Sequence, residues 1–168
     1  MSSQLDHSVV LERTERLLSA KSFHSKSFSQ IASELNVTNA YAAQLFFGQA
    51  QLKPHTLPKL KSCLPSLLDS DLNAMLTYTP TRSYDPTLIQ DPHVYRTHEA
   101  VMHYARAIKS IVNEEFGDGI MSAIDFYVDV GKTFGKHGEP RVVITLNGKF
   151  LQFNEQLTDD NTAPSPHM

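Results

Sequence analysis

The segment Gly117–Phe126, GDGIMSAIDF, marks the point where the predicted secondary structure changes from helix to strand. Its glycines are typical of a turn that ends a helix, and the pattern after them predicts a strand. On a regular strand, Ile120, Ile124 and Phe126 share one face. Ser122 lies on that face too. The sequence has no G-x-S-x-G motif and no evident base to activate this hydroxyl, so it is either bonded to backbone or has another function.

A long helix is predicted before this turn. Asp91 is the expected N-cap, Pro92 occupies the first helical position, and Gly117 ends the helix after Phe116. At about 100° per residue, apolar residues form a stripe along one face of this helix. The stripe contains Val94, Val101, Ala105, Ile108 and Val112.

Charged and polar residues lie opposite that stripe: Arg96, Glu99, His103, Arg106 and Ser110. Arg96 and Glu99 are three residues apart and therefore neighbours. By itself this spacing indicates only a solvated ion pair. Glu99 and His103 could also be two ligands of a metal, although no third ligand has suitable spacing.

Three strands are predicted after the turn: Ile120–Val130, Arg141–Leu146 and Lys149–Phe153. Asn147-Gly148 is a strong hairpin signal between the last two, and the segment 135–140 is expected to be a loop. Helices followed by short antiparallel strands indicate the α+β class.

The N-terminal half is predicted to be helical, and the proline-containing segment Thr79–Pro92 separates it from the rest. We expect a helical domain at residues 1–82 and a second domain at 83–168. The polar end of the chain, about 154–168, is expected to be mobile.

Part of the helical half, QIASELNVTNAYAAQLFFG, resembles the helix-turn-helix of repressor-type proteins. The segment that would read bases, Thr38–Phe47, contains no Lys or Arg. Asn39 and Gln44 could contact bases, but phosphate contacts supply most of the affinity of such complexes. We therefore favour a helical bundle of this geometry without DNA binding.

Composition and charge agree with that choice. The chain has 168 residues, 40% hydrophobic and 20% charged, with a net charge of −3. Residues 1–80 carry +1 and residues 81–168 carry −4, so neither half is basic.

No segment approaches the ~20 apolar residues of a membrane helix, and the N-terminus has no signal-like region. With Cys63 as the single cysteine, we expect a soluble, cytoplasmic protein.

Three segments closely resemble the cyanase (cyanate hydratase or cyanate lyase) family: YRTHEAV at Tyr95–Val101, EEFGDGIMSAIDF at Glu114–Phe126 and RVVITLNGKFL at Arg141–Leu151. The resemblance covers residues 90–153, and the family's first domain is similar to a DNA-binding fold without that role. It implies a bicarbonate-dependent decomposition of cyanate to ammonia and carbon dioxide by way of carbamate. It implies no metal or organic cofactor, and bicarbonate is a co-substrate.

The same resemblance places the catalytic residues at Arg96, Glu99 and Ser122, and apolar residues that contact substrate at Ile120 and Leu151. It also implies a homo-oligomer, a decamer of five intertwined dimers with active sites at subunit boundaries. Small anions, cyanate and bicarbonate, are then the expected partners, with neither DNA nor membrane. The alternative is a helix-turn-helix DNA-binding regulator whose C-terminal domain serves only for oligomerisation.

Overall fold

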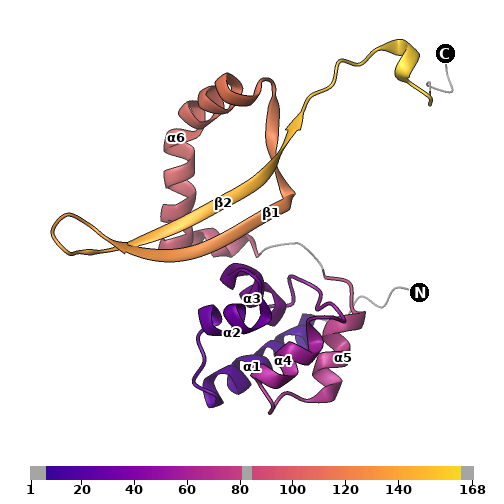
Figure 1. Cartoon of the computed structure of the whole chain (residues 1–168), viewed down its shortest axis with the longest axis vertical. Coiled ribbons are helices and arrows are strands. Elements are labelled where there is room, and N and C mark those ends of the chain that lie inside the picture. Colours follow the sequence, from indigo (N-terminus) through magenta and orange to yellow (C-terminus); the bar gives the residue numbers. More distant parts are fainter. Residues whose placement is uncertain (1–6, 81–84, 164–168) are drawn as a thin grey trace. The chain divides into compact units, whose positions relative to one another are not determined.

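The computed structural model of the chain describes residues 7–80 and 85–163. In these residues helices come first and a two-stranded sheet follows (Figure 1), which confirms the expected α+β class. The helices are α1 (His7–Phe23), α2 (Phe28–Leu35), α3 (Asn39–Phe46), α4 (Leu57–Cys63), α5 (Asp69–Thr77) and α6 (Pro92–Phe116), with 3-10 helices η1 (Pro86–Gln90) and η2 (Thr158–Asp160). The strands are β1 (Gly119–Phe134) and β2 (Pro140–Gln152).

The chain divides into two compact units. The first unit contains residues 1–84 and 127–147, and the second contains residues 85–126 and 148–168. The domain boundary expected between residues 82 and 83 lies outside the described residues. So do the last five residues of the segment that the sequence predicts to be mobile.

Helices α2 and α3 form the predicted helix-turn-helix pair. Ser27 and Gln30 make a capping box at the start of α2, and Asn36 ends that helix in the left-handed conformation, at φ 58°. Thr38 then caps α3 through the Tyr41 N–H. These local bonds satisfy backbone groups at both helix ends, which is why the turn between the helices can be so short.

The apolar core of the first unit is formed by residues from all five of its helices. Ala32, which the sequence places inside the helix pair, is buried and allows α2 to pack closely. The fully enclosed large side chains are Leu17, Ile31, Leu45, Phe46, Leu52, Leu60, Leu64, Leu72 and Met75. Every residue of this core belongs to the first unit.

Helix α6 begins and ends where the sequence predicts. Asp91 Oδ1 accepts the N–H groups of His93 and Val94 at 2.9 and 3.2 Å, and Gly117 follows the helix at φ +88°. No residue of α6 is buried in the single chain, so its apolar stripe has no covering partner among the described residues. Neither α6 nor any other helix described is long and apolar enough to cross a bilayer.

The hairpin predicted at Asn147-Gly148 is wrong, because β2 runs straight through both residues. A type I′ turn needs positive φ at its two central positions, and neither residue has it. The actual connection is the predicted loop, where the Gly135 N–H donates to the Glu139 carbonyl at 2.8 Å. Gly148 instead lies against β1, where a Cβ atom would come within 2.3 Å of the Ser122 carbonyl oxygen.

Candidate functional site

Arg96 and Glu99 form an ion pair on α6. Arg96 Nη1 donates to Glu99 Oε2 at 2.5 Å, and the Arg96 side chain is 72% exposed against 29% for Glu99. The hydrogen bond from Arg96 lowers the pKa of the Glu99 carboxyl, and the same bond raises the pKa of the Arg96 guanidinium. Glu99 is therefore a carboxylate at neutral pH, and its bond orients a guanidinium whose remaining donors are accessible.

Ser122 is buried in the single chain, with only 6% of its surface exposed. Its Oγ accepts the backbone N–H of Ile124 at 3.1 Å and of Asp125 at 3.0 Å. A serine hydroxyl has two acceptor lone pairs and one donor. Since both lone pairs are occupied, the Ser122 hydroxyl can bind a further partner only by donating its hydrogen. The backbone-bonded interpretation is confirmed, and the same bonds leave a hydroxyl suited to an anion.

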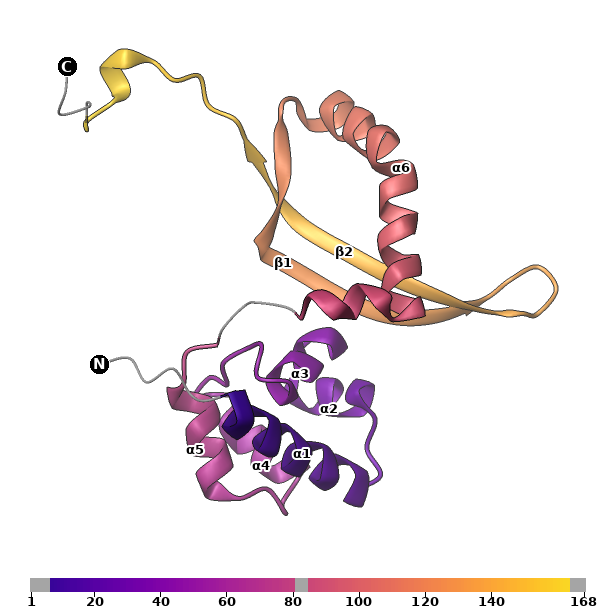
Figure 2. The ribbon, with the colours of Figure 1, turned by 180° about the vertical axis from the view of Figure 1, so that it is seen from behind.

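These bonds also change the path of β1. A side chain that accepts N–H groups two and three residues ahead makes a local turn, and β1 bends sharply along its length (Figures 1 and 2). The prediction that Ser122 shares one regular face with Ile120, Ile124 and Phe126 is therefore wrong beyond Ser122. Ile124 is 97% exposed while Ser122 is buried.

Two glycines bring the strands close together around Ser122. A Cβ on Gly119 would come within 2.4 Å of the Leu151 carbonyl oxygen, and one on Gly148 would meet Ser122 and Met121. Sequence reasoning missed Gly148 because it read the residue as part of a turn, although an isolated glycine in a strand also marks close backbone approach. Ile120 and Leu151, the predicted apolar contacts, come from these paired strands and are each about half exposed.

The predicted site residues therefore fall into two groups. Arg96 and Glu99 are bonded to each other on α6, whereas Ser122, Ile120 and Leu151 belong to the sheet. No hydrogen bond or ion pair recorded for the described residues joins Ser122 to Arg96 or Glu99. Arg96, Ile120 and Leu151 are exposed in the single chain, whereas Ser122 is buried.

A metal at Glu99 and His103 remains a hypothesis from their spacing. Within residues 7–80 and 85–163, no group of three or more His, Cys, Asp or Glu side chains could hold a metal ion. The Glu99 carboxylate is bonded to Arg96 instead. A metal at this pair would have to draw its other ligands from another molecule.

The helix-turn-helix residue best suited to read bases has another partner. The Asn39 side chain donates to the Val130 carbonyl at 2.7 Å and accepts the Val130 N–H at 3.0 Å, both within the first unit. This paired contact occupies the amide that would otherwise recognise adenine. Together with the absence of Lys or Arg from Thr38–Phe47, it disfavours DNA binding.

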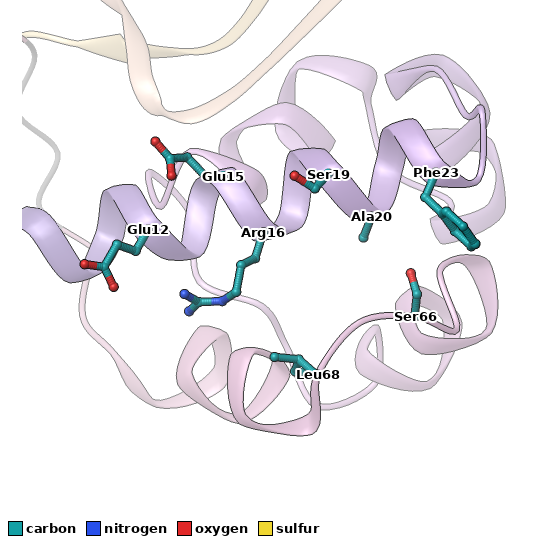
Figure 3. A pocket seen from close by; sticks show the side chains of 8 residues that line it. All are labelled: Glu12, Glu15, Arg16, Ser19, Ala20, Phe23, Ser66 and Leu68. Atoms are coloured by element: carbon teal, nitrogen blue, oxygen red, sulfur yellow. The ribbon is translucent and has the colours of Figure 1, made fainter.

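A groove on the first unit contains none of the predicted site residues. It lies between α1 and the segment 66–68, and Figure 3 shows Arg16 reaching across it. Arg16 makes two bonds to the buried Asp71 carboxylate, at 2.9 and 2.7 Å. The groove is lined by Glu12, Glu15, Arg16, Ser19, Ala20, Phe23, Ser66 and Leu68. We assign it no chemistry, because its central charge is already satisfied.

Comparison with known proteins identifies clear relatives. A family model described as the cyanate lyase C-terminal domain matches residues 86–155. A cyanate hydratase of Phaeodactylum tricornutum is 56% identical over 154 residues, which is 92% of this chain and 80% of that protein. A cyanate hydratase of Arabidopsis thaliana is also 56% identical, over 88% of this chain and 87% of its own length.

The fold has a solved counterpart as well. The crystal structure of cyanase from T. urticae is similar with a TM-score of 0.73 and 30% sequence identity. The similarity covers 86% of this chain and 99% of that one. At this coverage it includes parts of both halves of the chain, and the family model's residues 86–155 contain Arg96, Glu99 and Ser122.

Proposed function

This chain belongs to the cyanate hydratase (cyanate lyase) family, and we propose that it catalyses the bicarbonate-dependent decomposition of cyanate to ammonia and carbon dioxide. The structural observation that best supports this chemistry is the Ser122 hydroxyl, whose two backbone bonds leave only a donor. A serine hydroxyl that donates a hydrogen bond, with no base to deprotonate it, is suited to binding an anion. Both substrates of this reaction are anions. The non-enzymatic DNA-binding alternative is not favoured.

Arg96 would compensate part of the charge of the two substrates. Two anions brought together repel each other, and the repulsion increases as water is excluded. A guanidinium keeps its charge under these conditions and offers paired donors to planar oxygens. Since Glu99 occupies one η nitrogen, the other donors of Arg96 are available for cyanate or bicarbonate.

Ser122 would hold a substrate oxygen and stabilise the charge that develops on it. Its O–H is preset by the N–H groups of Ile124 and Asp125, so little reorganisation is needed during reaction. Ile120 and Leu151 would supply the apolar surface that keeps water away from the reacting atoms. Binding of an anion in a site that excludes water explains why the Ser122 hydroxyl lies beside apolar residues and has no general base next to it.

For Glu99 we favour an orienting role. The lowered pKa of its carboxyl keeps it ionised, so it lacks the proton that a general acid would deliver. A site covered by another subunit would raise that pKa by desolvation, and proton transfer to the cyanate nitrogen would then become available. Glu99→Gln separates the two roles, because glutamine can still orient Arg96 but cannot carry the proton.

The proposed path begins with attack by a bicarbonate oxygen on the cyanate carbon. The bicarbonate proton and one proton from solvent pass to the cyanate nitrogen, and the mixed intermediate loses carbon dioxide to give carbamate. Carbamate takes up a second proton from solvent and breaks down to ammonia and a second carbon dioxide. Holding both reactants in one site supplies much of the rate. No metal or organic cofactor takes part in this scheme.

We further propose that the active enzyme is a homo-oligomer, a decamer of five dimers, with sites shared between chains. The apolar stripe of α6 is uncovered in one chain, and Arg96 and Ser122 come from different elements. Covering that stripe would bury apolar area. Arg96 lies on the opposite face of α6, so a further chain would have to cover it. The single free cysteine, Cys63, is buried and compatible with action in the cytoplasm.

The test is ammonia release from cyanate with bicarbonate present and then rigorously removed, each with and without a chelator. We expect activity only when both anions are present, and no effect of chelation. Full activity without bicarbonate would contradict the mechanism. Loss on chelation would instead support a metal at Glu99 and His103. A gel-shift titration at physiological salt should detect no sequence-dependent DNA binding.

A further inference from the structure

The charge balance of the proposed site is incomplete. Arg96 is already paired with Glu99 at 2.5 Å, so this pair is neutral overall. Cyanate and bicarbonate together add two negative charges. Neutral donors such as Ser122 can bind these anions, but they do not compensate the net charge. The reaction as proposed above therefore calls for a further cation near the substrates.

Lys149 is the only lysine or arginine in the strand segments of the second unit, residues 119–126 and 148–152. It directly follows Gly148, which lies against the Ser122 carbonyl. On a regular strand it also shares a face with Leu151, two residues ahead. Its position in the sheet therefore places a positive charge beside the Ser122 part of the site.

A carboxylate from the Ser122 turn lies next to this charge. Asp125 donates its backbone N–H to Ser122 Oγ at 3.0 Å, and its Oδ2 is 3.9 Å from Lys149 Nζ. Both side chains are more than half exposed, at 65% for Lys149 and 60% for Asp125. An ion pair this long and this exposed contributes little to stability. At 3.9 Å the two groups are not hydrogen-bonded, so the Lys149 ammonium, unlike the Arg96 guanidinium, is not held by its carboxylate and can turn toward an anion.

We propose that Lys149 is the second cation of the anion site, a positioning residue whose charge favours binding of cyanate and bicarbonate and is moderated by Asp125. Lys149 acts through its field and touches no reacting atom. It raises the local concentration of anions and leaves the chemical step to Arg96 and Ser122. This inference rests on the proposed function, and its effect belongs in KM rather than in kcat.

Three variants test it by steady-state ammonia release at several ionic strengths. Lys149→Gln should raise KM for both anions by about 3- to 10-fold, with kcat within about twofold and a weaker dependence of kcat/KM on salt. Lys149→Arg should restore values near those of wild type. Asp125→Asn keeps its backbone bond to Ser122 and should change KM in the opposite direction.

The outcomes separate this inference from the proposed function. Failure of the wild-type protein to release ammonia contradicts the function itself. An active wild type with unchanged KM in Lys149→Gln, or a loss in kcat alone, overturns the role of Lys149. So does a Lys149→Arg variant no better than Lys149→Gln. Should Lys149→Gln not assemble, a KM in Asp125→Asn equal to or above that of wild type would overturn it.

Discussion

Replacement of Ser122 by alanine removes an oxygen with two separable roles. The backbone N–H groups of Ile124 and Asp125 lose their acceptor, and the substrate loses a donor. A buried donor left without a partner costs about 1–3 kcal/mol. Because these two N–H groups belong to exposed residues, water replaces part of the loss. We expect the free energy of unfolding to fall by about 1–2 kcal/mol.

The catalytic effect should be larger. Removal of one oriented donor lowers kcat by about 10²–10³, or about 2.7–4 kcal/mol of transition-state stabilisation. Domains of ordinary stability, about 5–15 kcal/mol, remain folded after the smaller loss. Ser122→Ala should therefore assemble normally, unfold at slightly lower urea concentration and release ammonia at less than about a hundredth of the wild-type rate.

Urea unfolding, light scattering on a sizing column and ammonia release measure the three quantities on one preparation. Ser33→Ala, an exposed serine on α2, is the matched control and should change none of them. Near-normal kcat in Ser122→Ala would refute the donor role. A variant that loses its assembly and its activity together would show that the backbone bonds are the whole contribution of Ser122.

Three further experiments test other parts of the site. Arg96→Lys should lose most activity while retaining assembly, because an ammonium cannot reproduce paired planar donors; kcat/KM measures this. Gly148→Ala should cost about 1–3 kcal/mol of stability and lower activity, because its Cβ would meet the Ser122 carbonyl oxygen at 2.3 Å. The control Gly131→Ala places its Cβ in open space and should be neutral. Arg96→Ala and Ser122→Ala subunits refolded together should recover activity that neither shows alone.

Each of these has a clear contrary result. Normal turnover by Arg96→Lys would mean that a point charge is sufficient. Equal stability of Gly148→Ala and Gly131→Ala in urea would mean that the strands separate there without cost. Verified mixed oligomers as inactive as their parents would place the complete site within one chain.

Helix boundaries were predictable because they depend on neighbours in sequence. Asp91 binds the N–H groups just ahead of it, and Gly117 supplies a left-handed φ directly after α6. The same local reasoning failed at Asn147-Gly148. There the required glycine conformation never arises, and the approach of β1 from more than twenty residues away determines the structure.

The site was predictable in its residues but not in its geometry. Family resemblance located Arg96, Glu99 and Ser122, and helical spacing indicated the Arg96–Glu99 pair. The alternating pattern of a regular strand could not reveal that Ser122 makes a local turn in the backbone. Because of this turn, the residues after Ser122 no longer share a face with it. Nor can periodicity in one chain show which faces another subunit covers.

The most direct test of the account follows carbon during turnover. When ¹³C-cyanate reacts with unlabelled bicarbonate by joining of the two anions, two molecules of carbon dioxide should be released for each ammonia. One of the two should carry the label. The label should appear transiently in carbamate. Simple hydrolysis of cyanate would instead give one labelled carbon dioxide per ammonia and consume no bicarbonate, and that stoichiometry would contradict the proposal that the site joins cyanate to bicarbonate.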